Sequence, residues 1–405
     1  MQLFAAVATA FAIFSAASAA PTAQLKTVEK YAGSIKPSSY IIKLKDGVSK
    51  DAHLAWLAET VGASATVTHA EWAADVVNGF AGTFDSDALN TLRASSDVES
   101  ITEDGIVTIA ATQTDATWGL QRINQAAKLT DQNTSDLAFT YTYDDSAGEG
   151  VDIYVVDTGI FTNHVGIVFV TYVPLAAQSN IRNSPSSRVV PCGVPPSVVM
   201  LGTVAGVTYG VAKKANLFAV KVLSDAGSGF VSDIVSALSW VSQQVTASGR
   251  PSIATMSLSG GASQTFDDAV ASLTAQGIHV TVAAGNNNAD ASSFSPARAP
   301  SAITVGASTI ADARASFSNF GSIVDIFAPG QNVISAWIGG VNNTNNISGT
   351  SMATPHIAGL VATIIGRDGN SSPANISTVI QTLSTKGELT GIPSGTVNDL
   401  ARTES

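Results

Sequence analysis

From residue 149 onward, short apolar runs alternate with segments of helical spacing. This alternation constrains the fold of the 405-residue chain more than any other feature. Strands are predicted over 151–156, 216–223, 253–258, 278–284 and 302–307, and helices over 232–244 and 266–275. Strands that are apolar along their whole length are typical of a parallel sheet between helices. The sequence therefore predicts an α/β domain whose ligands bind beyond the carboxyl ends of the strands.

A second, smaller domain is predicted before it, over residues 21–110. Its predicted helices are 50–61 and 86–94, and its predicted strands are 39–45, 64–69, 76–84 and 98–103. This β-α-β-β-α-β order is that of a ferredoxin-like α+β fold. Residues 109–117 are small and polar without an apolar period, so we expect an exposed linker that is open to cleavage.

Residues 1–20 form an uncharged, apolar stretch that ends in small residues. It is too short and too rich in alanine to span a bilayer stably, so we expect a signal peptide and a secreted, extracellular protein. No later segment is apolar for long enough to cross a membrane. With Cys192 as its single cysteine, the chain can form no intrachain disulfide bond. The net charge of -11 argues against nucleic acid as a partner, because phosphate binding needs a basic surface.

Three polar residues stand at places where a reaction site could form. Asp157 and Asn286 each come directly beyond a predicted strand, and Ser351 lies where a loop is predicted to enter a helix. The first N–H groups of that helix would face whatever the serine hydroxyl attacks. Pro355 is expected in the first turn, where its missing N–H is harmless. Taken alone, Ser351 is more simply explained as a helix N-cap.

Taken together, these segments closely resemble those of the subtilisin-like serine proteases (peptidase family S8), and among them the secreted proteinase K group. The resemblance rests on the order Asp157, Asn286, Ser351 and on the motifs at 210–214, 227–229, 257–260, 316–321 and 325–330. It implies a subtilisin-like three-layer domain with a mainly parallel sheet over 111–405. Residues 21–110 then resemble an inhibitor I9-type propeptide, which would be removed by self-cleavage after about Ala110.

The resemblance also implies roles for individual residues, which are those described for subtilisin itself. Ser351 would be the nucleophile, the Asn286 side-chain amide the oxyanion donor, and Asp157 the carboxylate that orients a histidine base. Substrate backbone would pair with two segments, consisting of Gly227, Ser228, Gly229, Ser257, Leu258 and Ser259. A structural calcium ion would bind oxygen atoms of Pro300, Ala302 and Asp325, since this hard cation prefers oxygen ligands.

The histidine base is missing from its expected position. The family carries it in a His-Gly-Thr-His-Val-Ala-Gly-Thr segment, and alignment on Gly202 and Thr203 places Pro196 where it should stand. The chain has five histidines at other positions, His53, His69, His164, His279 and His356. In subtilisin, loss of the histidine lowers turnover by about 10⁶, so the chain as written should be close to inactive.

Two explanations of this gap are open. Residues 166–201 lack the turn and strand signals of the rest of the domain, and an out-of-frame reading of 188–197 resembles the family segment before the histidine. The first hypothesis is therefore that 166–187 are a translated intron followed by a frame-shifted exon. The second is a catalytically impaired homologue that acts as a peptide-binding or non-enzymatic protein.

The leading prediction is a secreted serine endopeptidase of broad specificity, made as a self-processing precursor and acting by Ser-His-Asp acyl transfer. Its expected partners are protein or peptide substrates and its own propeptide. We expect a monomer that binds no membrane. Migration on a gel distinguishes an active endopeptidase from the catalytically impaired homologue. The active enzyme removes about 110 residues from itself, whereas the impaired homologue stays at full length unless another protease cuts it.

Overall fold

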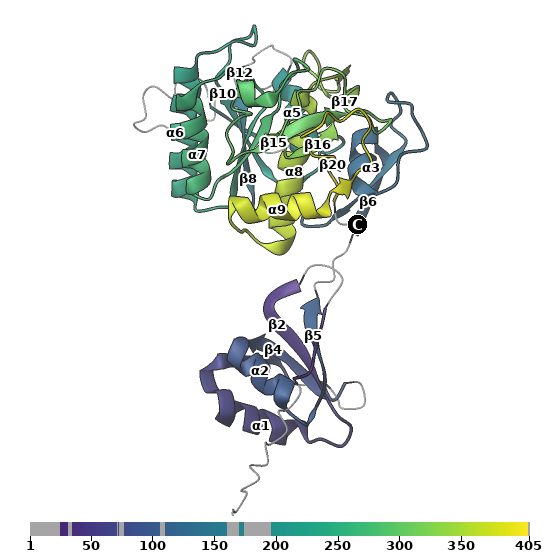
Figure 1. Ribbon diagram of the computed structural model, residues 1–405, viewed down its shortest axis with the longest axis vertical. Coiled ribbons are helices and arrows are strands. Elements are labelled where there is room, and N and C mark those ends of the chain that lie inside the picture. The colour runs from purple at the N-terminus through teal and green to yellow at the C-terminus, as the bar shows by residue number, and fades with distance from the viewer. Residues whose placement is uncertain are drawn as a thin grey trace, which may run out of the picture. The chain divides into compact units, whose positions relative to one another are not determined.

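The structure is a computed structural model that describes residues 25–30, 35–70, 72, 77–105, 110–159, 170–173 and 196–403. Contacts divide the chain into two compact units, Met1–Ile106 and Val107–Ser405. Figure 1 shows both, coloured from purple at the N-terminus to yellow at the C-terminus. No helix in the described ranges has the length and apolar character that a membrane crossing requires.

The first unit contains a sheet that, in the described residues, has five strands in the order β1-β5-β2-β4-β3. The strands are β1 (Val28–Glu29), β2 (Ile35–Leu44), β3 (Ala65–His69), β4 (Gly79–Phe84) and β5 (Val98–Gly105). Strands β2 to β5 pair antiparallel, and β1 lies parallel to β5 at the edge. With its two helices, this arrangement confirms the predicted ferredoxin-like α+β fold.

The two helices of this unit have the predicted bounds because local signals set them. They are α1 (Lys50–Val61), followed by the 3₁₀ turn η1 (Gly62–Ser64), and α2 (Ser86–Ala94). The Ser49 hydroxyl accepts the N–H of Ala52 at the start of α1, and Gly62 ends α1 with a φ of 54°. The Asp85 carboxylate accepts the N–H of Ala88 at the start of α2. Leu57 of α1 and Leu92 of α2 pack in one core with Ile42, Leu44, Phe80, Phe84 and Ile101 of the strands.

The second unit is built on a sheet that, within the described residues, has nine strands in the order β19-β20-β16-β15-β13-β11-β8-β10-β9. All neighbours from β20 to β9 pair parallel, and β19 pairs antiparallel with β20. The strands are β8 (Asp152–Asp157), β9 (Val170–Val173), β10 (Asn216–Lys221), β11 (Ser252–Met256), β13 (His279–Ala283), β15 (Ile303–Ser308), β16 (Ile326–Pro329), β19 (Thr385–Lys386) and β20 (Asp399–Leu400). The predicted parallel α/β sheet is confirmed.

Helices cover this sheet on both faces and give three layers. They are α3 (Trp118–Asn124), α5 (Pro196–Ala205), α6 (Val231–Ser248), α7 (Gln264–Ala275), α8 (Thr350–Asp368) and α9 (Pro373–Leu383). Alternate residues of β8 enter two cores: Ile153 and Val155 pack with α5 and α8, while Tyr154 and Val156 pack with α6 and α7. Figure 1 shows α6 and α7 side by side on one side of the sheet. Burial on both faces explains why these strands are apolar along their whole length.

Short pairs of strands complete the second unit: β6 (Ala110–Ala116) with β7 (Phe139–Asp144), β12 (Gly260–Gly261) with β14 (Phe294–Ser295), and β17 (Val333–Ala336) with β18 (Thr344–Ile347). A 3₁₀ turn, η2 (Ala291–Ser293), precedes β14. The predicted linker over 109–117 is wrong for 110–116, which form β6. The strand is held by backbone pairing with β7, which a local reading of small polar residues does not reveal.

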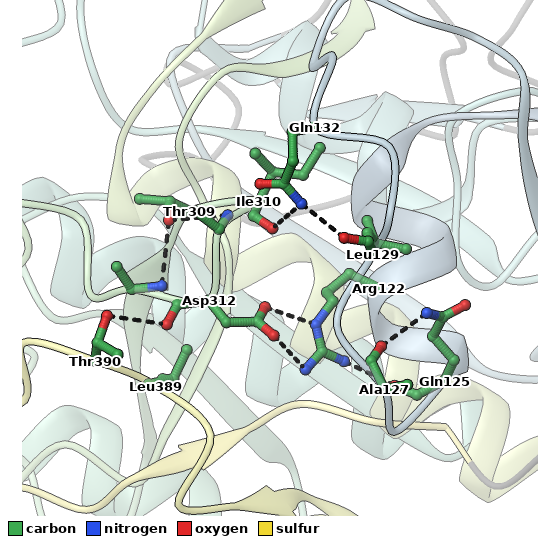
Figure 2. A network of polar contacts seen from close by, with 12 residues as sticks. Arg122, Gln125, Ala127, Leu129, Gln132, Thr309, Ile310, Asp312, Leu389 and Thr390 are labelled. Atoms are coloured by element: carbon green, nitrogen blue, oxygen red, sulfur yellow. Dashed lines mark hydrogen bonds and ion pairs between the residues drawn. The ribbon is translucent and has the colours of Figure 1, made fainter.

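The N-terminal part of the second unit is fixed by a buried ion pair, shown in Figure 2. Arg122 in α3 is fully buried, and its Nε and Nη2 donate to the two Asp312 carboxylate oxygens at 2.8 and 3.1 Å. Its Nη1 donates to the Gln125 carbonyl at 2.7 Å. Further along, Asn124 Nδ2 donates to the Thr403 hydroxyl at 2.9 Å, so the end of the described chain is tied to α3.

Some predictions fall outside the described residues. The signal peptide over 1–20 does, and so do His164 and Cys192. The anomalous stretch 166–201 is described only at 170–173, which form β9 beside β10, and at 196–201, which begin α5. Val199, Met200 and Leu201 are fully buried against α8 in the main core of this unit.

Candidate active site

The carboxyl ends of four parallel strands open into one cleft of about 740 Å³. The predicted catalytic residues Asp157, Asn286 and Ser351 all line it. So do the predicted substrate-binding residues, Gly227, Ser228, Gly229, Ser257, Leu258 and Ser259. Further lining residues are Thr158, Leu223, Val231, Ile234, Gly260, Gly261, Phe266, Ala283, Gly285, Asn287, Phe294 and Thr350. The structure thus brings together three segments that lie up to 194 positions apart in the sequence.

Ser351 is the second residue of α8, two positions after the N-cap Gly349. Its hydroxyl donates to the Ser257 carbonyl at 3.1 Å, so its proton is held by a backbone oxygen in this structure. Among the described residues, the Ser351 N–H donates to no protein acceptor, as expected for the first turn of a helix. The prediction for Pro355 is wrong: α8 begins at Thr350, and Pro355 therefore lies inside the helix, beyond the first turn.

Asn286 is held in one orientation by the start of α8. Its Oδ1 accepts hydrogen bonds from the N–H and the hydroxyl of Thr350, at 2.8 and 2.9 Å. Within the described residues its Nδ2 donates to no protein atom, which leaves this donor for a ligand in the cleft. The loop before it turns at Gly285, with φ +102°, where a Cβ would lie 2.4 Å from the Asn319 amide nitrogen.

Asn319 in turn holds the loop that carries Asn286. It is fully buried, its Nδ2 donates to the Ala284 carbonyl at 2.8 Å, and its Oδ1 accepts the N–H groups of Asn287 and Ala289. The sequence motif 316–321 contains this residue, but nothing in the motif predicts which loop it supports. Thr350 and Asn319 are thus positioning residues that the sequence does not reveal.

Asp157 ends β8 and is 2% exposed. Its Oδ1 accepts the N–H of Thr158 at 2.6 Å, and its backbone carbonyl accepts the N–H of Val222 at 2.8 Å. Lys221, at the end of β10, donates to the carbonyl oxygens of Thr158 and Leu223. These bonds join the ends of two neighbouring strands and hold the carboxylate at the edge of the cleft.

No histidine of the described residues lines the cleft. His53 and His69 lie in the first unit, and His279 is buried in β13 with its Nε2 2.8 Å from Asn370 Oδ1. His356 is buried in α8, where its Nδ1 lies 2.9 Å from the Met352 carbonyl oxygen. Burial lowers the pKa of His356 to about 4, so the ring is neutral at physiological pH. Pro196, the residue at the expected position of the base, is the first residue of α5.

The predicted calcium ligands lie away from the cleft. Asp325 stands next to the start of β15, where its Oδ2 accepts the N–H of Thr304 at 2.8 Å. Burial raises the pKa of Asp325 to about 6, because few protein groups compensate the charge of its carboxylate. No group of three or more His, Cys, Asp or Glu side chains forms a metal cluster in the described ranges. A cation here would therefore depend on carbonyl oxygens, such as those of Pro300 and Ala302, which suits a hard ion.

Comparison with known proteins agrees with this arrangement. Residues 194–397, about half the chain, match the family model described as Subtilase family. The chain belongs to the subtilase family. Residues 39–110 match the model described as Peptidase inhibitor I9. The predicted family, fold and enzyme class are therefore confirmed: this subtilase is a serine endopeptidase precursor with an inhibitor-type propeptide.

Named relatives cover most of this subtilase. It is 42% identical over 375 residues to "Cuticle-degrading protease" of Metarhizium anisopliae, covering 91% of this chain and 90% of the relative. It is 41% identical to "Proteinase R" of Parengyodontium album, covering 91% and 89%. A solved structure, "Crystal structure of a cold adapted subtilisin-like serine proteinase", matches with a TM-score of 0.62 and 37% identity. That match covers 72% of this chain and 99% of the solved one.

Proposed function

We propose that this subtilase cleaves peptide bonds with Ser351 as nucleophile, Asn286 as oxyanion donor and Asp157 as the carboxylate that orients a base. The Ser351 Oγ attacks the carbonyl carbon, and negative charge develops on the carbonyl oxygen as the C–O bond forms. The Asn286 Nδ2 and the Ser351 N–H can both donate to that oxygen. In subtilisin itself, loss of the asparagine donor costs about 10²–10³ in rate.

The observation that carries this proposal is the orientation of Asn286. Thr350, the residue before the nucleophile Ser351, donates two hydrogen bonds to the Oδ1 of Asn286. These bonds fix the side-chain amide next to the start of α8 and leave its Nδ2 as a donor for the substrate. The serine proton passes to the amide nitrogen as the C–N bond breaks, so the amine leaves and the acyl-enzyme remains. Water then attacks the same carbonyl carbon, one of its protons passes to the Ser351 Oγ as the ester C–O bond breaks, and the acid is released. The segments 227–229 and 257–259, which line the same cleft, are proposed to pair with the substrate backbone.

We further propose that Pro196 occupies the position of the general base and that the chain as written hydrolyses slowly. A proline has no group that takes a proton, and the serine hydroxyl keeps a high pKa without a base. In subtilisin, removal of the histidine leaves only about 10³–10⁴ of acceleration over water. A natural transcript with a changed reading frame across 166–201 would restore the histidine, whereas an unbroken frame would establish Pro196 as genuine.

The test is a Pro196→His variant. Hydrolysis of a chromogenic peptide should rise by at least about 10³-fold if Asp157 and Ser351 stand where a histidine can join them. A Pro196→Gln variant is the matched control, since glutamine cannot act as the base, and Ser351→Ala added to Pro196→His should abolish the gain. A folded Pro196→His variant with no gain in rate would contradict the assigned roles.

The precursor is proposed to be secreted and to lose its propeptide near Ala110. Such cleavage would leave β6 with the second unit, because β6 pairs with β7. N-terminal sequencing of protein from the medium would give a start near Ala111 for the active form. We also propose a monomer that binds no membrane, which light scattering would test.

We propose calcium as a structural ion held by Asp325 with the carbonyl oxygens of Pro300 and Ala302. The carboxylate is half-buried and its pKa is raised, so a cation would stabilise its charged form. Calcium should then raise the thermal midpoint of the protein, and Asp325→Asn should remove most of that effect.

A further inference from the structure

The nucleophile's own backbone carbonyl lacks the hydrogen bond that a helix normally supplies. In α8 the carbonyl of Ser351 would accept the N–H of the residue four positions later, which is Pro355. Proline has no N–H, and its ring also obstructs the carbonyl four positions before it. The carbonyl of the nucleophile must therefore find a donor elsewhere, since an unpaired backbone oxygen is costly.

Ser257 supplies that donor from the sheet. Its hydroxyl donates to the Ser351 carbonyl at 3.1 Å, and the Ser351 hydroxyl donates to the Ser257 carbonyl at 3.1 Å. Ser257 directly follows β11, whose five residues are all buried. Two reciprocal hydrogen bonds thus tie the nucleophile to the end of a central strand. Both partners are half-buried and line the cleft.

We propose that Ser257 is a positioning residue for Ser351, and that its hydroxyl replaces the helical donor that Pro355 removes. A regular helical hydrogen bond would fix the backbone of Ser351 only relative to the rest of α8. The hydrogen bond from Ser257 fixes the backbone of Ser351 relative to segment 257–259, which is proposed to pair with the substrate. The position of the nucleophile relative to the bound substrate is thereby fixed as well. This inference rests on the proposed role of Ser351.

The decisive experiment is a double-mutant cycle of Ser257→Ala and Pro355→Ala. Ser257→Ala should lower kcat about 5- to 10-fold with little change in KM, since a single hydrogen bond to a carbonyl is lost. Pro355→Ala introduces an N–H at the position that faces the Ser351 carbonyl. The double variant Ser257→Ala with Pro355→Ala should therefore have a kcat within about 3-fold of Pro355→Ala alone. If the Ser257 side chain only fills space, the effects of the two substitutions should be independent and no such coupling is expected. Kinetics are measured in the Pro196→His background, where we expect the rate to be higher.

Hydrogen exchange gives a second readout that needs no activity. In the chain as it stands, Ser257→Ala should speed amide exchange of the peptide over 349–356 about 10-fold, and Pro355→Ala should reverse this. Ser272→Ala is the matched control, because the Ser272 hydroxyl donates to the Asp268 carbonyl at 2.8 Å in α7, outside the cleft. It should change neither the exchange of 349–356 nor kcat.

Each outcome decides a different point. Unchanged kcat and exchange in Ser257→Ala, or a loss that Pro355→Ala does not relieve, overturns the positioning role while Ser351 remains the nucleophile. If Ser351→Ala in the same background keeps the full rate of hydrolysis, the proposed nucleophile is wrong and the positioning role falls with it. A threonine at the same place offers a rescue: Ser257→Thr keeps the hydroxyl and should retain most of kcat.

Discussion

Removal of one charge from the Arg122–Asp312 pair should strongly destabilise the second unit. Arg122 is fully buried and Asp312 is 3% exposed, so neither group is hydrated in the folded state. In Asp312→Asn the guanidinium stays charged, because arginine does not lose its proton in proteins. Asp312 has a φ of 55°, which asparagine tolerates better than most residues, so the variant keeps the backbone. It removes the charge and replaces one of the two oxygens that accept from Arg122 by an amide NH2. Loss of one partner of a buried ion pair typically costs about 3–5 kcal/mol.

The free energy of unfolding from urea titration measures this cost, and the thermal midpoint should fall by roughly 10 °C. Lys214→Ala is the control, since Lys214 pairs with Asp145 at an exposed site and should contribute less than about 1 kcal/mol. The double variant Arg122→Leu with Asp312→Asn removes both charges and should be less destabilised than Asp312→Asn alone. If Asp312→Asn unfolds within about 1 kcal/mol of the parent protein, the idea that the pair balances two dehydrated charges is refuted.

Two further predictions concern pH and have opposite signs. Burial raises the pKa of Asp325 to about 6, so the folded state binds this proton more tightly than the unfolded chain does. Without calcium, this group should lower the free energy of unfolding by about 3 kcal/mol as the pH rises from about 4 to 6. Asp325→Asn should abolish that contribution in urea titrations at pH 4.5 and 6.5, and an identical pH slope in both proteins would contradict it. Burial lowers the pKa of His356 to about 4, so this group stabilises the fold above pH 6.5 and loses about 3 kcal/mol as the pH falls towards 4. His356→Gln should therefore flatten the acid side of the stability profile, and an unchanged profile would show that His356 does not titrate there.

Elements with local signals are the ones that the sequence predicts well. Both helices of the first unit begin and end as expected, because Ser49, Asp85 and Gly62 act within three residues of the helix ends. The strand at 110–116 was not predicted, since its partner β7 lies more than 20 residues away and supplies only backbone pairing. The small and polar residues of that strand carry no period that would separate it from a linker.

In the candidate site, too, residues with a local sequence motif could be predicted, whereas contacts between distant residues could not. Asp157, Asn286 and Ser351 could be named from their motifs, and parallel strands bring their segments to one edge. The supporting bonds could not be predicted, because Asn319 and Thr350 act on residues 30 to 65 positions away. The position of Pro355 inside α8 depends on where the helix begins, which the sequence predicts least reliably.

The tie between Asn124 and Thr403 has a consequence for the order of folding. The two residues are separated by 279 positions, and Arg122 and Asp312 by 190. Contacts between such distant positions form slowly, because a long loop must close before they contribute. During synthesis, the second unit cannot complete its N-terminal segment until Thr403 has left the ribosome, whereas the described strand pairings of the first unit all lie within residues 28–105. The inhibitor-type unit is therefore folded before the peptidase unit can close its own structure.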